Sequence, residues 1–190
     1  MNLVVVRHGR TEANASGKLL GRLDVTLDEV GRAQAERLAA SVGHVDRVVS
    51  SPLTRTRETA TAFGRPVEID DRLIELDYGE LDGRPLGDVP ADVWSRWRAD
   101  ITFAPPGGES LLALGERVRA ALDALATGAG DETIAVVTHV SPIKAAVAWA
   151  LGTTDEVTWR LFVAPASITR IDVNERGPIV RSFNEVAHLL

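Results

Sequence analysis

Short runs of β-branched residues separated by amphipathic segments dominate the hydrophobic pattern of this chain. Residues 3–6 read LVVV, and the segment 133–138 has IAVV at its centre. Continuous apolar runs of this length are typical of strands that are buried on both faces of a parallel sheet. Four other segments have the length and composition of strands: 47–50, 67–69, 166–173 and 179–183.

Apolar residues at helical spacing alternate with these strands. From Thr26 to Val42 they recur every three or four positions, and Thr26 with Glu29 has the spacing of a capping box. Ser141 is expected to cap another helix, with Pro142 at its first position. Further helices are predicted at 52–63 and 110–126. This alternation predicts an α/β fold, a three-layer α/β/α sandwich around a mostly parallel sheet with one antiparallel edge strand.

A stretch rich in proline and glycine interrupts the alternation. Residues 84–109 hold four prolines and three glycines and predict a lid-like excursion with one short helix around Trp94 and Trp97. A chain of 190 residues with 45% apolar composition can bury an ordinary core. We therefore expect one domain over residues 1–190 that carries this excursion.

The charge of the chain argues against two classes of partner. The net charge is −6, from 21 basic and 27 acidic residues, which disfavours nucleic acid and anionic membrane surfaces. Residues 1–60 hold 9 basic and 7 acidic side chains, so 12 basic and 20 acidic ones remain in residues 61–190. A locally basic N-terminal third in an acidic chain indicates a small anionic ligand.

The absence of cysteine alone leaves the compartment open, so the prediction of a compartment rests on the length of the apolar runs. There is no cysteine, which excludes disulfides, thiolate metal sites and a cysteine nucleophile. The apolar run 3–6 is too short for the core of a signal peptide, and 145–151 is far below the ~20 residues that span a bilayer. We therefore expect a cytoplasmic protein. The sequence indicates no particular oligomeric state.

Arginine and histidine side chains follow three predicted strands at their carboxyl ends. Arg7 and His8 come directly after the first strand, Arg55 comes just after the second, and His139 directly follows the strand at 133–138. In open α/β sheets these strand ends form the crevice where ligands bind. Two arginines and two histidines beside helix N-termini predict a phosphate site there.

Five short motifs add to this interpretation. They read LVVVRHGRTEAN at 3–14, SSPLTR at 50–55, ELDYG at 75–79, PGGES at 106–110 and VTH at 137–139. Together they resemble the histidine phosphatase superfamily, also called the phosphoglycerate mutase-like family. The matches occur in the family's order over roughly residues 3 to 145.

The resemblance implies catalytic roles for five residues. His8 would attack phosphorus and form a phosphohistidine, since a neutral imidazole is nucleophilic near neutral pH. Arg7 and Arg55 would bind the non-bridging phosphate oxygens, and a protonated His139 would stabilise the charge that develops on them. Glu75 would protonate the leaving alkoxide and then help water attack the phosphohistidine.

The choice of the acid depends on the resemblance. Glu75, Asp77, Glu80 and Asp82 lie in one acidic stretch, and their spacing does not distinguish a catalytic carboxyl group from a solvated loop. The family's pattern selects Glu75.

The resemblance also implies that Asn14, Gly21 and Val140 contact the substrate. Val140 departs from the family's pattern, because many relatives have glycine after the second histidine, and its side chain would either narrow the pocket or change a backbone contact. Since arginine supplies the positive charge of the implied mechanism, no metal site and no cofactor are expected. The expected partner is a small phosphorylated substrate.

Two activities and one binding role remain open. Mutase relatives carry a longer, basic insertion where this chain has residues 84–109, which hold three arginines against four acidic residues. We therefore favour a phosphomonoesterase over a cofactor-dependent phosphoglycerate mutase-type phosphoryl transfer. A catalytically weak regulatory protein that binds phosphate esters is disfavoured, because all five catalytic positions are occupied.

The excursion and the last predicted helix hold side chains of undecided role. Trp94, Trp97 and Phe103 are expected either to cap the core or to form a specificity lid over the leaving group. Lys144, on the second turn of the helix after His139, is expected to be solvated rather than catalytic.

Overall fold

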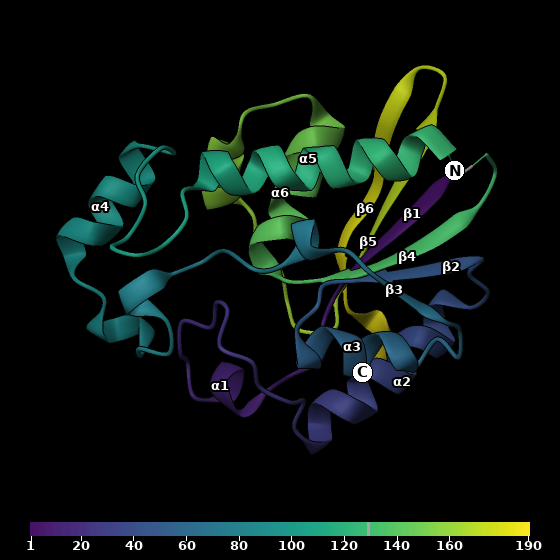
Figure 1. The fold of residues 1–190 in the computed structure, drawn as a ribbon. Coiled ribbons are helices and arrows are strands. Elements are labelled where there is room, and N and C mark those ends of the chain that lie inside the picture. Colours follow the sequence, from purple (N-terminus) through teal and green to yellow (C-terminus); the bar gives the residue numbers. More distant parts are fainter. Residues whose placement is uncertain (129) are drawn as a thin grey trace.

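The computed structural model describes residues 1–128 and 130–190. Its six strands form one sheet in the order β3-β2-β4-β1-β5-β6 (Figure 1). The strands are β1 (Asn2–Arg7), β2 (Arg47–Ser50), β3 (Val67–Ile69), β4 (Thr133–Thr138), β5 (Ile168–Asn174) and β6 (Gly177–Glu185). β1 to β4 run parallel, β5 is antiparallel to β1, and β6 is antiparallel to β5. The expected mostly parallel sheet is confirmed, with an antiparallel pair at one edge.

Helices cover both faces of the sheet, which confirms the three layers. They are α1 (Glu12–Ala15), α2 (Glu29–Val42), α3 (Thr54–Thr61), α4 (Ala91–Ala99), α5 (Leu111–Gly128) and α6 (Val140–Leu151). Figure 1 shows α5 and α6 on one side of the sheet and α2 and α3 on the other. Among the described residues, none of these helices has the length and apolar character needed to cross a membrane.

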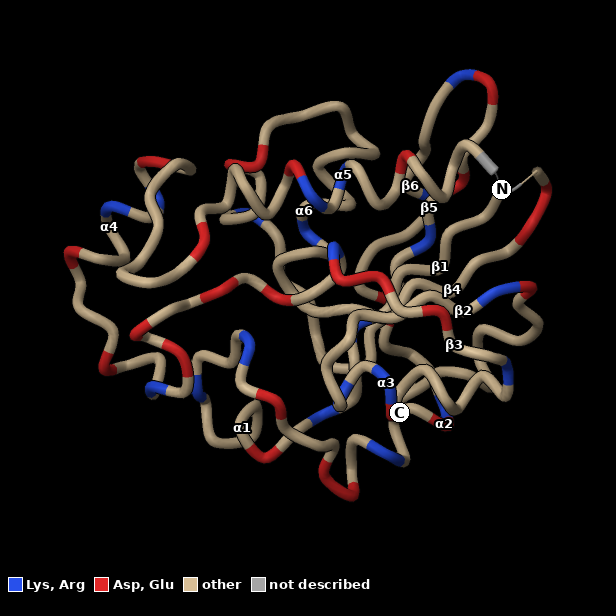
Figure 2. Tube along the Cα trace, viewed as in Figure 1, with Lys and Arg blue, Asp and Glu red and all other residues tan. Residues whose placement is uncertain are grey.

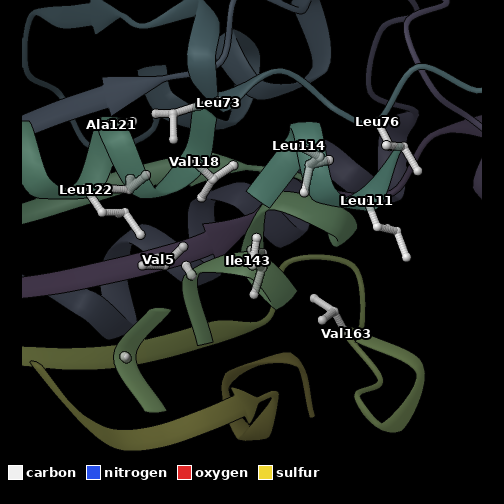
Figure 3. Packing of buried hydrophobic residues seen from close by; sticks show 14 of the residues in the cluster. Val5, Leu73, Leu76, Leu111, Leu114, Val118, Ala121, Leu122, Ile143 and Val163 are labelled. Atoms are coloured by element: carbon white, nitrogen blue, oxygen red, sulfur yellow. The ribbon is translucent and has the colours of Figure 1, made fainter. Parts of the chain in front are cut away.

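The two faces of β1 belong to two separate apolar clusters. Val5 packs with Val118 of α5 and Ile143 of α6, as the close-up in Figure 3 shows. Val4 and Val6 instead join the cluster on the side of α2 and α3. Successive side chains of a strand point to opposite faces, so a strand between two helical layers has to be apolar throughout. This is the physical reason for the unbroken LVVV run.

The pairing of β1 with β4 brings two predicted site segments together. Arg7 lies opposite Thr138 in the parallel register, and His8 donates its backbone N–H to the Thr138 carbonyl at 3.0 Å. His8 and His139 therefore leave the sheet side by side. Figure 2 shows the charged residues lying away from the middle of these strands, which hold only uncharged residues.

Two predicted helix starts are wrong. Asp28, rather than Thr26, caps α2, because its carboxylate accepts the N–H of Gly31 at 2.7 Å. The helix after β4 begins at Val140 with His139 as its N-cap residue, so Ser141 is not the cap and Pro142 is the third helical residue.

The excursion packs onto the core through its aromatic residues. Trp97 of α4 is 1% exposed and stacks with Trp94 at 5.7 Å between ring centroids. It also meets Phe103 and Trp159 in T-shaped contacts. The aromatic residues of the excursion therefore extend the main apolar cluster, as one of the two interpretations predicted.

Candidate active site

A cavity of about 210 Å³ opens where β1 and β4 end. Five of the eight residues predicted for the site line it: Arg7, His8, Asn14, Glu75 and Val140. We call it the active-site cavity. Its walls come from the loop after β1, the acidic loop and the start of α6, segments far apart in the sequence.

The His8 imidazole is buried and has a defined tautomer. Its Nδ1 lies 2.7 Å from the Gly9 carbonyl oxygen, and because a carbonyl only accepts, Nδ1 carries the proton. Nε2 therefore keeps its lone pair. Burial, followed by the nearby charges of Arg55 and Arg7, lowers the pKa of His8 well below its usual value. The imidazole is thus neutral at neutral pH, as a nitrogen nucleophile must be.

Close backbone contacts fix the loop that carries His8. Gly9 donates its N–H to the hydroxyl of Thr59 in α3 at 3.1 Å. A Cβ atom at Gly9 would lie 2.3 Å from the carbonyl oxygen of Gly31, and one at Gly31 would lie 2.0 Å from that of Arg10. Only glycine permits this approach of the loop to the first turn of α2.

Two arginines, the half-buried Arg7 and the buried Arg55, lie close enough to His8 for their charges to act on it, and each has an Nε–H that is not used. Arg7 donates through Nη1 to the Val163 carbonyl at 2.7 Å, and Arg55 donates to the carbonyls of Leu23 and Gly21 at 2.8 and 2.6 Å. In the described chain, the Nε–H of each arginine has no acceptor. Burial lowers the pKa of Arg7 to about 10 and also lowers that of Arg55, so both stay charged at neutral pH. Buried charges of this kind call for an anion.

Gly21 does not line the active-site cavity. Its carbonyl orients Arg55, and its N–H donates to the Asp82 carboxylate at 2.7 Å. Asp82 also accepts the backbone N–H groups of Arg22 and Leu23 at 2.8 and 2.9 Å. In this structure Gly21 therefore belongs to the loop that positions Arg55.

His139 is fully buried beside His8, with ring centroids 5.2 Å apart and planes at 64°. Its Nε2 lies 2.7 Å from the Ser51 hydroxyl, while Nδ1 has no partner among the described residues. Burial, and after it the charges of Arg55, His8 and Arg7, lower the pKa of His139 well below its usual value. On the charges of the protein itself His139 is therefore neutral, and its protonation beside a bound phosphate stays a prediction.

Glu75 lies at the start of α6 and acts as its cap. Oε2 accepts the N–H of Val140 at 3.0 Å, and Oε1 accepts those of Leu76 and Ser141 at 2.8 and 3.2 Å. Pro142 comes next and has no N–H to donate. A carboxylate here also interacts favourably with the positive end of the helix dipole. Val140 thus contributes its backbone to the acid and its side chain to the cavity wall.

The other three acidic residues of that stretch point elsewhere. Asp82 holds the loop of Gly21, Asp77 accepts the N–H of Gly79 and pairs with Arg22 at 3.1 Å, and Glu80 is exposed. Among the four, only Glu75 lines the active-site cavity.

A family comparison gives this arrangement a context. The model of the histidine phosphatase superfamily (branch 1) matches residues 3–186. The chain belongs to the histidine phosphatase superfamily. This match confirms the resemblance that implied the roles of the site residues.

The names of similar proteins in the histidine phosphatase superfamily state several different activities. Phosphoserine phosphatase 1 of Hydrogenobacter thermophilus is 33% identical over 100% of this chain and 94% of its own length. A probable phosphoglycerate mutase, GpmB, of Yersinia enterocolitica is 32% identical over 100% of this chain and 95% of its own. The structure of a mycobacterial glucosyl-3-phosphoglycerate phosphatase superposes with a TM-score of 0.89 at 30% identity, covering 97% of this chain and 99% of that one.

The matches do not all extend over whole proteins. The chain spans 54% of the length of a bifunctional protein of Mycobacterium tuberculosis that is 34% identical over 98% of this chain. What the names of these relatives describe is their own activity. For the present chain the comparisons show membership of the histidine phosphatase superfamily.

Asn14 lines the cavity from α1, a helix that the sequence pattern did not predict. Thr11 and Asn14 cap it reciprocally: the Asn14 N–H donates to the Thr11 hydroxyl, and the Thr11 N–H donates to the Asn14 amide oxygen, both at 3.2 Å. A helix of four residues is too short to show periodicity.

Five residues of the cavity wall were not predicted from the sequence: the polar Lys18 and Tyr78, and the apolar Leu19, Leu20 and Leu86. Lys18 and Tyr78 both line the cavity, and Tyr78 lies inside the ELDYG motif that was already assigned to this family. Burial and the charge of Glu75 raise the pKa of Tyr78, so its hydroxyl remains a donor at neutral pH. Lys18 follows α1 and carries no pattern in the sequence that would have singled it out.

Proposed function

We propose that this protein is a phosphomonoesterase that hydrolyses a small phosphorylated metabolite through a phosphohistidine intermediate on His8. One observation carries the proposal: His8, in the wall of the active-site cavity, keeps an unprotonated Nε2, and among the described residues the Nε–H groups of the nearby Arg7 and Arg55 have no acceptor. A neutral nucleophile beside unpaired buried cations is suited to attack a phosphate dianion.

The reaction proceeds in two steps. The first step starts from the protonated form of Glu75, which the charge of a bound phosphate dianion favours. Nε2 of His8 forms a bond to phosphorus, the bond from phosphorus to the ester oxygen breaks, and Glu75 gives its proton to the leaving alkoxide. In the second, water gives a proton to Glu75 and attacks phosphorus, and the bond to Nε2 breaks. Inorganic phosphate and the alcohol are the products, and both side chains regain their starting protonation.

The remaining side chains stabilise the transferred group. Arg7 and Arg55 donate to the non-bridging oxygens, and His139 donates through a ring nitrogen. Phosphate binding introduces the negative charge that favours the charged form of His139. The roles of Asn14 and Val140 are to orient the ester, since both line the cavity.

Hydrolysis is favoured over mutase transfer by the character of the excursion. Residues 84–109 are short and weakly acidic, which does not suit a tightly held bisphosphate. The names of the relatives include both activities. Incubation with 3-phosphoglycerate and a bisphosphate primer separates them, because a mutase yields the isomer and a phosphatase yields inorganic phosphate.

Trapping of the intermediate tests the nucleophile. After brief incubation with a ³²P-labelled phosphomonoester and quenching without acid, the wild-type protein should carry acid-labile label. The His8→Ala variant should carry none. His44→Ala is the matched control and should be labelled normally, because His44 is exposed and does not line the active-site cavity. Label that persists in His8→Ala would exclude the proposed nucleophile.

Activity should persist in a chelator, because the mechanism draws its positive charge from arginine and histidine. Hydrolysis measured before and after dialysis against EDTA tests this. Binding of phosphate esters without hydrolysis over a broad panel would instead favour the regulatory alternative.

A further inference from the structure

A second cavity of about 140 Å³ adjoins the active-site cavity. Leu19, Tyr78 and Val140 line both of them, so the two share a wall. The second cavity is enclosed by α4, the start of α5, α6 and the segment around Trp159. We call it the tryptophan cavity. Its volume resembles the ~150 Å³ of an engineered protein cavity that holds benzene.

Three indole rings form one side of the tryptophan cavity. Trp94 stacks on Trp97 at 5.7 Å, and Trp159 meets Trp97 and Trp94 edge-on at 6.3 and 6.4 Å. The chain has four tryptophans, so most of them lie here. Interlocked rings of this kind give a rigid wall of fixed shape, which suits recognition of one small group.

A lysine also lines the tryptophan cavity. Lys144 of α6 lines the tryptophan cavity and is half-buried, rather than solvated as the sequence suggested. It is one of only two lysines among the 21 basic residues of the chain. Within the described residues, its ammonium makes no ion pair within 4.0 Å and no hydrogen bond. Burial lowers its pKa, a direction that the charge of Glu75 opposes.

The Lys144 ammonium, without a counterion in an apolar cavity, indicates that the ligand of this cavity is an anion. Partly desolvating a cation without a counterion is unfavourable, and a bound anion removes that cost. Three residues that carry hydroxyl groups, Tyr78, Ser141 and Thr158, also line the cavity. One ammonium with neutral hydroxyls matches a single negative charge, whereas a second phosphate dianion would require more cationic donors. A carboxylate meets these conditions.

We propose that the tryptophan cavity holds the leaving group and that Lys144 binds a carboxylate on it. The substrate class is then a small phosphomonoester of a hydroxy acid, with the phosphate at His8 and the carboxylate at Lys144. This inference rests on the proposed function, because it assigns the alcohol half of the same ester. Lys144 determines specificity and takes no part in the chemical steps.

A matched pair of substrates isolates the carboxylate. 3-Phosphoglycerate and glycerol 3-phosphate have nearly the same size, and the second replaces the carboxylate with a hydroxymethyl group. The wild-type ratio of their kcat/KM values should favour 3-phosphoglycerate, and Lys144→Met should lower that ratio about tenfold or more. Lys144→Arg should restore part of it. Arg176→Met, which removes an exposed cation from the turn between β5 and β6, lies outside both cavities and should leave the ratio unaltered.

Several outcomes would overturn the assignment. A wild-type ratio near one, or an equal loss for both substrates in Lys144→Met, would mean that Lys144 acts on the phosphate or on Glu75. Tighter Lys144-dependent binding of 2,3-bisphosphoglycerate than of 3-phosphoglycerate would assign the cavity to a second phosphate. Thermal unfolding of each variant separates these effects from misfolding.

A binding measurement separates this inference from the proposed function. If no ester is hydrolysed, including p-nitrophenyl phosphate, the phosphatase proposal fails. Calorimetric titration of 3-phosphoglycerate and glycerol 3-phosphate into His8→Ala and into His8→Ala/Lys144→Met still tests the cavity. Loss of the preference for 3-phosphoglycerate in the double variant supports the carboxylate site, and an unchanged preference refutes it.

Discussion

Val140 donates its backbone N–H to Glu75 Oε2 at 3.0 Å, although the two residues lie 65 positions apart. The same carboxylate accepts the N–H of Ser141. The group proposed as the catalytic acid therefore also caps the helix that follows His139. The Glu75 side chain therefore affects both the reaction and the stability of the helix. A substitution that keeps the hydrogen-bond acceptor and one that removes it can separate the two effects.

We expect Glu75→Gln to lower kcat by about 10²- to 10⁴-fold for an alkyl phosphate, because the amide cannot transfer the proton. The loss should be much smaller with p-nitrophenyl phosphate, whose leaving group needs little protonation. The amide oxygen still accepts a helix N–H, so the melting temperature should change little. Steady-state kinetics with both esters and thermal unfolding measure these effects.

Glu75→Ala is the companion variant. It removes the cap as well as the acid, so it should lose about 0.5–2 kcal/mol of stability beyond Glu75→Gln. Equal losses of kcat for alkyl and p-nitrophenyl phosphate in Glu75→Gln would show that Glu75 is not the acid.

Arg117 of α5 positions the loop of Glu75. It donates to the carbonyls of Arg72 and Ile74 at 2.6 Å each and to that of Glu75 at 3.2 Å. It also pairs with Glu109 at 2.7 Å. We expect Arg117→Met to lower kcat for an alkyl phosphate about tenfold, and less for p-nitrophenyl phosphate, because the acid loses its position.

Arg119→Met provides the matched control on the same helix. Arg119 holds the buried Asp155 through two hydrogen bonds, away from the loop of Glu75. Arg119→Met should destabilise the fold without altering the ratio of the kcat for an alkyl phosphate to the kcat for p-nitrophenyl phosphate. An identical shift of that ratio in both variants would show that Arg117 acts through general stability alone.

The buried histidines predict a loss of stability in acid. His8 and His139 have pKa values below the ordinary 6.5 in the folded protein, so under mildly acidic conditions the unfolded chain binds protons that the folded protein does not. The free energy of unfolding therefore falls as the pH drops below about 6.5, by up to about 1.4 kcal/mol per pH unit for each histidine.

Denaturant titrations between pH 5 and 8 measure this dependence against a His8→Gln/His139→Gln variant. As the pH falls from 8 to 5, the free energy of unfolding should decrease more for the wild-type protein than for the variant. Inorganic phosphate should reduce the acid loss of the wild-type protein, because its charge favours protonated His139. If the free energies of unfolding of the two proteins differ by the same amount at every pH, burial does not lower the pKa of either histidine.

Gly31 should not tolerate a side chain. A Cβ atom there would lie 2.0 Å from the Arg10 carbonyl oxygen, so the loop of His8 must move. We expect Gly31→Ala to lower both stability, by about 1–3 kcal/mol, and kcat/KM. Gly87→Ala is the control, because a Cβ atom at Gly87 would meet nothing within 4 Å beyond its chain neighbours. Wild-type behaviour of Gly31→Ala in unfolding and kinetics would contradict this.

The sequence by itself determined the strands, most of the helices and the placement of the charged groups at strand ends. The unbroken apolar runs at Leu3–Val6 and Ile134–Val137 require burial on both faces, and burial between two helical layers is what the structure shows. Because parallel strands end at one edge of the sheet, Arg7, His8 and His139 had to meet. These features follow from local pattern and sheet geometry.

Only the tertiary structure decided where distant partners meet. Asp28 replaces Thr26 as a cap, and Glu75 caps α6 from across the fold. Gly21 orients Arg55 instead of lining the cavity, and burial together with the nearby charges of Arg55 and Arg7 keeps His139 neutral in the protein without ligand. Hydrogen-bond partners and electrostatic environment depend on residues far away in sequence, and a local pattern carries no information about them.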